Sequence, residues 1–205
     1  MTTTVPGAAG YSANATALAS QYESITFAEV YRDLIHLFPA QPVAVVDIGA
    51  GSGRDAAALA RCGHQVVAVE PTLELRRAGQ RLHGALPIEW MDDHLPSLNV
   101  LRRAMRRFDV VLLTAVWMHL EPKEQEVAME AIAELTAENG QVFMSLRHGP
   151  MPEGRRMFDV SAEDTLRLAA GHGLRCHYQV EREDMLGRGD VRWSFLALRR
   201  WPTSE

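Results

Sequence analysis

Residues 43–54, VAVVDIGAGSGR, constrain the fold more than any other part of the sequence. Four of the first six are β-branched and all but Asp47 are apolar, which is typical of a central parallel strand buried on both faces. Gly49, Gly51 and Gly53 follow at alternate positions, and a helical pattern begins directly after them. Because ligands of open α/β sheets bind where strands end in such turns, the stretch predicts an α/β fold with a ligand site at the glycines.

The rest of the chain alternates between strand and helix patterns. Further strands are expected at 66–70, 87–91, 109–115 and 141–146, and helices at 54–61, 73–82, 98–107, 122–138 and 161–171. Two final strand patterns, 175–181 and 192–199, are joined through a segment containing Gly187 and Gly189, which predicts an antiparallel hairpin. The expected fold is α/β: a doubly wound, seven-stranded mixed sheet with helices on both faces and a C-terminal antiparallel hairpin.

The 205 residues are expected to form a single domain, because no repeat or low-complexity linker divides them. Residues 1–12 are expected to be a mobile tail, residues 13–40 an N-terminal helical cap and residues 41–205 the α/β core. The first twenty residues contain no Lys or Arg and no compact apolar segment, so they match neither a signal peptide nor a transit peptide. No apolar run reaches the roughly 18 residues of a membrane span, so no membrane association is expected.

Charge and cysteine content narrow the class of protein further. The 26 acidic and 21 basic residues give a net charge of −5, which argues against DNA as a partner and disfavours RNA. Cys62 and Cys176 lie far apart without metal-binding spacing. We therefore expect a reduced, cytoplasmic protein, monomeric or homodimeric, with no metal site.

Two common nucleotide-binding motifs do not fit the glycine stretch. The dinucleotide motif G-x-G-x-x-G, counted from Gly49, requires a glycine where Arg54 stands, and the P-loop ending Gly-Lys-Ser/Thr is absent. The observed pattern is Asp-x-Gly-x-Gly-x-Gly, beginning at Asp47. It resembles the first motif of the class I S-adenosylmethionine-dependent methyltransferases, and the resemblance covers roughly residues 43–146.

This resemblance implies S-adenosylmethionine as the cofactor and assigns the glycine stretch to it. Gly49, Ala50, Gly51 and Gly53 would lie along the cofactor, and Asp47 would fix the loop through water or face the cofactor's amino group. The same family places an acid at the end of its second strand to accept both ribose hydroxyls. Glu70 followed by Pro71 occupies that position here, and a carboxylate suits a vicinal diol because each oxygen accepts a hydrogen bond.

An acid after the third strand receives the adenine amino group in similar proteins. Asp92 and Asp93 stand at this point, and Asp92 is favoured, although the loop is one residue shorter than the common pattern. The alternative is that these carboxylates cap a helix or face solvent. The resemblance also places Thr114 and Ala115, at the end of the fourth strand, beside the cofactor, with Tyr22 covering it.

Acceptor-binding residues are expected after strands four and five. Trp117 or Met118 would flank the cofactor and the acceptor, and His119 would serve as a base because its pKa lies near working pH; the alternative is that His119 caps the loop before Pro122. Arg147 and His148 lead a loop that also contains Arg155 and Arg156. An arginine of this loop, Arg147 first, would pair with an acidic group on the acceptor, unless these arginines face solvent.

The sequence therefore predicts a methyltransferase that acts on a small-molecule acceptor. The main alternative is a non-catalytic sensor of S-adenosylmethionine or S-adenosylhomocysteine, followed by an RNA or protein methyltransferase. The identity of the acceptor and of the methylated atom does not follow from the sequence.

Overall fold

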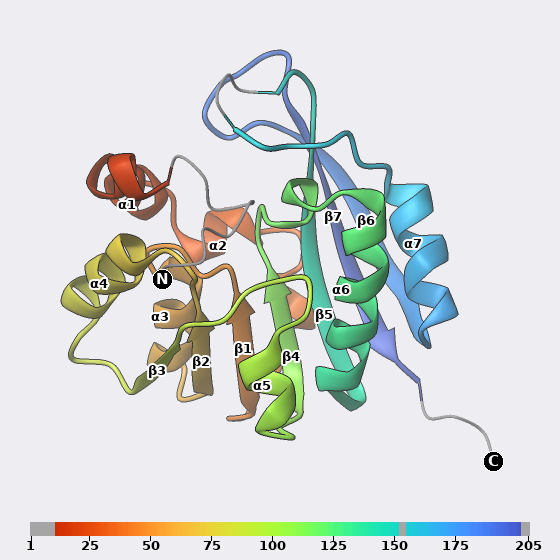
Figure 1. Cartoon of the computed structure of the whole chain (residues 1–205), viewed down its shortest axis with the longest axis horizontal. Helices are drawn as coiled ribbons and strands as arrows, with labels where there is room; N and C mark the ends of the chain where they lie inside the picture. Colours follow the sequence, from red (N-terminus) through yellow and green to blue (C-terminus); the bar gives the residue numbers. More distant parts are fainter. Residues whose placement is uncertain (1–10, 152–154, 202–205) are drawn as a thin grey trace.

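The computed structural model describes residues 11–151 and 155–201. Its sheet has the strand order β3-β2-β1-β4-β5-β7-β6 (Figure 1). The strands are β1 (Ala44–Ile48), β2 (Gln65–Val69), β3 (Ile88–Met91), β4 (Phe108–Leu113), β5 (Thr136–His148), β6 (Leu174–Glu183) and β7 (Arg192–Arg200). Neighbouring strands from β3 to β5 are parallel, and β7 runs antiparallel to both β5 and β6. The predicted seven-stranded mixed sheet with its C-terminal hairpin is confirmed.

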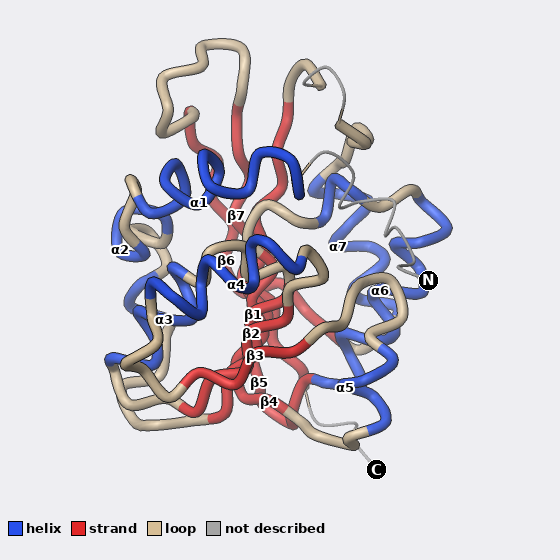
Figure 2. Tube along the Cα trace, turned by 60° about the vertical axis from the view of Figure 1, so that its left-hand side comes forward, coloured by secondary structure: helices blue, strands red, loops and turns tan. Residues whose placement is uncertain are grey.

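Helices cover both faces of this sheet (Figure 2). They are α1 (Ala15–Glu23), α2 (Phe27–Val30), α3 (Arg54–Arg61), α4 (Leu73–Leu82), α5 (Asn99–Arg103), α6 (Pro122–Leu135) and α7 (Ala162–Gly171). Alternate residues of each strand face opposite layers. Val45 belongs to the apolar cluster that contains Leu59 of α3, whereas Val46 belongs to the cluster that contains Leu101 of α5 and Ile132 of α6.

The N-terminal helices form a cap near the carboxyl ends of the strands. Leu18 and Ala19 of α1 pack with Leu75 and Ala78 of α4 in a small apolar cluster of their own. Residues 1–10 of the predicted tail lie outside the described residues, and Tyr11 leads into a short 3-10 turn, Ser12–Asn14. The cap therefore lies beside the edge of the sheet at which the glycine turn is found.

Two predicted helices are longer than the observed ones. Helix α6 ends at Leu135, not at residue 138, because Thr136 turns to extended backbone and begins β5, while its hydroxyl donates to the Ile132 carbonyl at 2.7 Å. The expected stop at residues 139–140 lies inside β5, where Asn139 has φ 61° and the register against β4 shifts. Helix α5 ends at Arg103, and Met105 has φ 50°, which breaks a helix.

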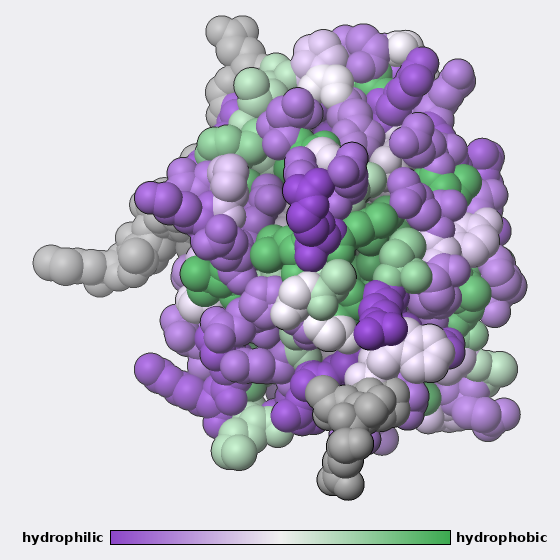
Figure 3. All heavy atoms as spheres, turned by 90° about the vertical axis from the view of Figure 1, so that its right-hand side faces the viewer, coloured by the Kyte–Doolittle hydropathy of each residue, from purple (hydrophilic) through white to green (hydrophobic). Residues whose placement is uncertain are grey.

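The surface on the side of α7 is largely hydrophilic, with an apolar area near its centre (Figure 3). Cys62 and Cys176 are exposed and free. Within the ranges that the structure describes, no helix has the length and apolar character needed to cross a bilayer.

Candidate active site

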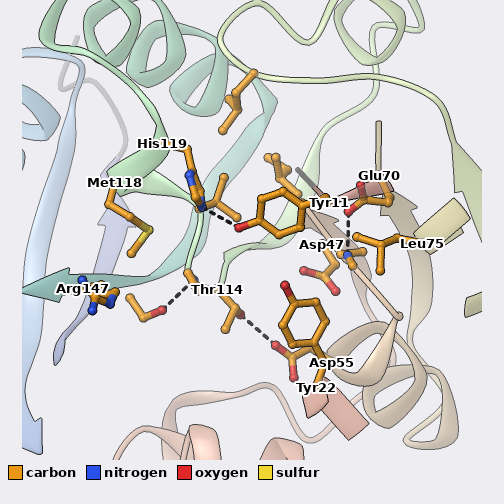
Figure 4. A pocket seen from close by; sticks show the side chains of 18 of the residues that line it. Tyr11, Tyr22, Asp47, Asp55, Glu70, Leu75, Thr114, Met118, His119 and Arg147 are labelled. Carbon is orange, nitrogen blue, oxygen red and sulfur yellow. Dashed lines mark hydrogen bonds between the residues drawn. The ribbon is translucent and has the colours of Figure 1, made fainter. Parts of the chain in front are cut away.

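A pocket of about 330 Å³ opens at the carboxyl ends of the parallel strands (Figure 4). It lies where the strand order changes direction: from β1 the chain continues to β2 and β3 on one side and then returns to β4 on the other side of β1. In doubly wound sheets the loops after the two strands at such a point, here β1 and β4, diverge to opposite sides of the sheet and leave a crevice between them. Its wall combines residues of the glycine turn, the N-terminal cap and the segments after β4 and β5.

The glycine loop turns tightly from β1 into α3. Gly49, Gly51 and Gly53 have φ values of 72°, 58° and 84°, a region that glycine adopts without steric strain. A Cβ on Gly49 would lie 2.6 Å from Val116, and one on Gly53 would lie 2.6 Å from the Trp90 ring. Gly49, Ala50 and Gly51 line the pocket, whereas Gly53 lies behind the loop and supports it.

Asp47 forms part of the pocket floor beneath this loop. It is 2 % exposed, and its Oδ2 atom has no hydrogen-bond partner among the described residues. Burial, reinforced by the nearby Asp55, raises the pKa of this carboxyl well above its ordinary value. A buried carboxylate oxygen without a partner is unfavourable, so Asp47 is suited to a cationic or donor group of a ligand.

Glu70 follows β2 on the same side of the pocket. Its Oε2 accepts a hydrogen bond from the Gly51 amide at 2.8 Å, and its Oε1 accepts one from the Thr72 amide at 2.7 Å. Burial raises its pKa, and these two bonds act in the opposite direction. Each oxygen retains a further lone pair, so a ligand diol could still donate to both. The contact with Gly51 also fixes the carboxylate against the glycine loop.

The two acids after β3 point in different directions. Asp92 pairs with Arg76 at 2.7 Å, its side chain is 68 % exposed, and it lies outside the pocket lining. Asp93 is buried, lines the pocket and accepts hydrogen bonds from the amides of Val100 and Leu101 at the start of α5. The alternative expectation matches these contacts, since Asp92 faces solvent and Asp93 accepts from the first amides of α5. Of the two acids only Asp93 reaches the pocket, because successive residues of an extended segment face opposite sides.

Thr114 belongs to a buried hydrogen-bond network between β4 and α3. Its hydroxyl donates to Asp55 at 2.8 Å and lies 2.6 Å from the Tyr31 hydroxyl. Arg54 pairs with the same Asp55 at 2.6 Å. Asp55 is not among the residues expected at the site, although an acid directly after the glycine stretch is a visible signal in the sequence. Its position makes Thr114 a fixed part of the pocket wall.

His119 lies in the 3-10 turn Trp117–His119 and lines the pocket. Its Nδ1 is 2.8 Å from the Arg156 carbonyl oxygen, and its Nε2 is 3.0 Å from the Tyr11 hydroxyl. Burial lowers the pKa of the imidazole. Neighbouring Met118 also lines the pocket, whereas Trp117 is fully buried and donates to Thr165 instead.

Two tyrosines from the cap close the pocket on the side opposite the sheet. Tyr22 lies 3.2 Å from the position of a Cβ on Gly51, and burial raises its pKa. Tyr11 also lines the pocket, and Arg155 lies over its ring at 5.0 Å. Tyr11 falls in the segment predicted to be a mobile tail. The only sequence signal for its role at the site is that it is an aromatic residue among small ones. Tyr11 lies between Glu70 and His119, and Tyr22 lies next to Asp47 (Figure 4).

Arg147 and His148 diverge at the end of β5. Arg147 is 8 % exposed and lines the pocket next to Met118 (Figure 4). His148 lies outside the lining, and its Nε2 is 2.8 Å from the Ser194 hydroxyl of β7. The alternation of the strand therefore brings only Arg147 to the pocket.

Most of the residues expected at the site do meet in one pocket. Those that line it are Tyr22, Asp47, Gly49, Ala50, Gly51, Glu70, Pro71, Asp93, Thr114, Ala115, His119 and Arg147. Gly53, Asp92 and His148 do not. Among residues 11–151 and 155–201, no three His, Cys, Asp or Glu side chains form a group suited to a metal ion.

Solved structures with the same fold include three methyltransferases. An S-adenosylmethionine-dependent TehB-like methyltransferase from Corynebacterium glutamicum is 17% identical, with 93% of this chain and 99% of that chain covered and a TM-score of 0.69. Magnesium protoporphyrin IX methyltransferase from Synechocystis, with bound S-adenosylmethionine, is 15% identical (93% and 84% covered, TM-score 0.67). The Burkholderia thailandensis 1,6-didemethyltoxoflavin-N1-methyltransferase, with bound 1,6-didemethyltoxoflavin and S-adenosylhomocysteine, is 20% identical (93% and 90% covered, TM-score 0.62).

A family model agrees with these structural likenesses. No curated protein matches the chain significantly. The model of the methyltransferase domain family, however, matches residues 22–184, which is most of the chain. The resemblance inferred from the glycine motif is thereby confirmed. The chain belongs to the methyltransferase domain family, and its fold is that of the class I S-adenosylmethionine-dependent methyltransferases.

Proposed function

We propose that this protein binds S-adenosylmethionine at the glycine loop and transfers its methyl group to a small-molecule acceptor. The observation that carries the proposal is the continuity of the pocket. The glycine loop, Asp47 and Glu70 form one end of it, and the same space extends to His119 and Arg147. One pocket therefore provides room for a cofactor and an acceptor side by side, as a direct transfer requires.

The residues at the first end fit this cofactor. The unpartnered Oδ2 of Asp47 suits the cofactor's ammonium group, and pairing with a cation would favour the charged carboxylate that burial disfavours. Glu70 would accept from the two ribose hydroxyls through its remaining lone pairs. Asp93, Pro71 and Leu75 line the adjoining part of the wall, where the adenine would lie.

At the second end, the chain would orient the acceptor and exclude water. S-adenosylmethionine supplies an activated methyl group on its sulfonium, so the protein's main tasks are alignment and, for a protonated nucleophile, removal of a proton. His119 is the candidate base because it faces the pocket and because burial lowers the pKa of its imidazole, which favours the neutral form. Tyr11 and Tyr22 would cover the reacting groups from the cap.

Transfer of labelled methyl groups tests the proposal. The protein is incubated with S-adenosylmethionine labelled in its methyl group and a bacterial extract separated into low-molecular-weight, protein and RNA fractions. We expect label only in the low-molecular-weight fraction, and loss of that label in the Glu70→Ala variant. Label in protein or RNA would contradict a small-molecule acceptor, and binding of the cofactor without any transfer would indicate a sensor.

A further inference from the structure

The charged side chains of the pocket are unevenly paired. Three of its five arginines are neutralised by carboxylates that also line it: Arg54 by Asp55 at 2.6 Å, Arg156 by Glu124 at 2.8 Å and Arg188 by Asp184 at 2.6 Å. Three carboxylates remain: Asp47 lies near the end of β1, Glu70 follows β2 and Asp93 follows β3. The remaining arginines are Arg147, at the end of β5, and Arg155, in the loop after it.

The pocket therefore has an acidic end and a basic end. Figure 4 shows Asp47 and Glu70 on the opposite side of the pocket from Arg147, with Tyr11 between the two sides. The acidic end is the one assigned to the cofactor, whose sulfonium and ammonium groups are cationic. The basic end is left for the acceptor.

Neither Arg147 nor Arg155 pairs with a carboxylate among the described residues, and Arg147 is the buried one of the two. It is 8 % exposed, and no carboxylate among the described residues lies within 4.0 Å of its guanidinium. Its NH1 donates to the Gly149 carbonyl at 3.3 Å, and its Nε has no partner in the same set of residues. A buried, unpaired guanidinium is unfavourable in the folded state, so the observation points to a partner that the chain itself does not supply.

Two acids, Asp184 and Asp190, lie close enough to favour the charged form of Arg147, but neither forms an ion pair with it. Asp184 accepts hydrogen bonds from the Arg188 guanidinium and from the Trp193 indole at 2.9 Å, which holds the β6–β7 connection against the pocket. Arg155 lies over the Tyr11 ring. At the basic end, the N–H groups of Arg147 are thus the donors that remain available to a ligand.

The walls around Arg147 are apolar. Met118 from the turn after β4, Met157 from the loop after β5, and Trp193 and Leu186 from the hairpin line this end. A ligand that fits here therefore combines an anionic group with an apolar body. Both thioether and aromatic side chains adapt well to flat or irregular apolar groups.

Resting on the proposed function, we propose that the methyl acceptor is a small carboxylic acid with an apolar body, whose carboxylate pairs with Arg147. A carboxylate matches the planar guanidinium fork and would satisfy the free Nε as well as the terminal nitrogens. Because Arg155 is held over the Tyr11 ring, the single guanidinium of Arg147 within apolar walls suits a monoanion better than a phosphate dianion. Arg147 thereby selects the acceptor and orients it toward the cofactor end.

Matched acids and amides test this inference. The protein is saturated with S-adenosylhomocysteine, and the binding of 3-phenylpropanoate, 3-phenylpropanamide, octanoate and octanamide is measured by ligand-observed NMR. We expect each acid to bind at least 10-fold more tightly than its amide. Equal affinities, or no binding of either acid, would overturn the inference.

Two variants separate recognition from a structural role of the arginine. Arg147→Met removes the charge but keeps an unbranched side chain of similar length, and Arg167→Gln removes an exposed charge on α7 outside the pocket. We expect Arg147→Met to lose the preference for acids while its midpoint of thermal unfolding stays equal or rises, because no unpaired charge is then buried. Arg167→Gln should keep the preference. A preference retained by Arg147→Met, or a marked fall in its unfolding temperature, would contradict the assignment.

The same samples distinguish this inference from the function on which it rests. Binding of S-adenosylhomocysteine without a preference for acids would overturn the acceptor class and leave the methyltransferase proposal standing. Failure of S-adenosylhomocysteine to bind the wild-type protein would overturn both.

Discussion

The Tyr11 hydroxyl lies 3.0 Å from Nε2 of His119, although 108 positions separate the two residues. The other ring nitrogen of His119 faces the Arg156 carbonyl oxygen at 2.8 Å. Because a carbonyl only accepts, Nδ1 carries the hydrogen, and Nε2 accepts from Tyr11 in the neutral ring. His119 would thus act as a base only when the Tyr11 hydroxyl moves aside or relays the proton.

Replacing Tyr11 by Phe should raise the pKa of His119. The phenol donates to the neutral imidazole and so stabilises that form; without it the protonated form gains relative to the neutral one. The NMR titration of the His119 ring protons measures this change. Tyr178→Phe, a tyrosine that lies against His36 and outside the pocket, is the control. An unchanged titration of His119 in Tyr11→Phe would contradict the hydrogen bond.

The protein should lose stability as the pH falls below about 6.5, the ordinary pKa of histidine. Burial lowers the pKa of His119 in the folded state, so the unfolded chain binds the proton first, and the free energy of unfolding falls until the lowered pKa is passed. His119→Asn removes this contribution. Thermal unfolding between pH 7 and pH 5 should therefore show a smaller decrease for His119→Asn than for wild type, and parallel curves would exclude the effect.

Glu70→Gln should weaken the binding of S-adenosylhomocysteine roughly 10- to 100-fold, which corresponds to the loss of charged hydrogen bonds. The NH2 group of the glutamine side chain would also face the backbone N–H of Gly51 or of Thr72, and two donors cannot form a hydrogen bond. Calorimetric titration measures the affinity. Glu74→Gln, an exposed acid on the neighbouring α4, should bind as wild type does. Equal affinities of all three proteins would refute the role of Glu70.

Asp92 and Asp93 should respond differently to the same substitution. Asp92→Asn removes only a surface ion pair with Arg76, so its effect on cofactor affinity and on stability should be small, about 0–1 kcal/mol. Asp93 accepts hydrogen bonds from the backbone amides of His94, Val100 and Leu101. Asp93→Asn weakens this acceptor and should lower the free energy of unfolding by about 1–3 kcal/mol. Denaturant titration of both variants measures the difference. A larger effect for Asp92→Asn would reverse the order that the geometry favours.

Gly53→Ala should destabilise the protein more than Gly187→Ala. Both glycines have positive φ, 84° and 75°, so both variants share the backbone strain. A Cβ at Gly53 would lie 2.6 Å from the Trp90 ring, whereas nothing lies within 4 Å of one at Gly187. We expect the first variant to be less stable by a further 1–3 kcal/mol, roughly the range for overpacking. Equal denaturation midpoints would show that Trp90 moves away freely.

Local patterns predicted the sheet and the cofactor end of the site. The strand before Gly49 and the acid that ends the next strand are short-range signals, and parallel strands bring their carboxyl ends to one edge. Asp47, Glu70 and the glycine loop meet in the pocket for this reason. The sequence alone did not separate Asp92 from Asp93, because that choice depends on which way an extended segment is rotated.

Contacts between distant segments were not predictable in the same way. Tyr11 reaches His119 only because α1 packs on α4 and carries the preceding turn across the sheet edge. The missing counter-ion of Arg147 likewise depends on the distant β6–β7 connection, where Asp184 pairs with Arg188 and not with Arg147. The end of α6 at Leu135 depends on the register of β5 against β4, which outweighs the expected stop at residues 139–140.

Calorimetric titration of the wild-type protein with S-adenosylmethionine, S-adenosylhomocysteine and NADH tests the central claim most directly. We expect one site per chain with micromolar affinity for S-adenosylmethionine and for S-adenosylhomocysteine, and no heat of binding for NADH. Absence of binding by both S-adenosyl compounds, or binding of NADH, would contradict the assignment of the glycine loop.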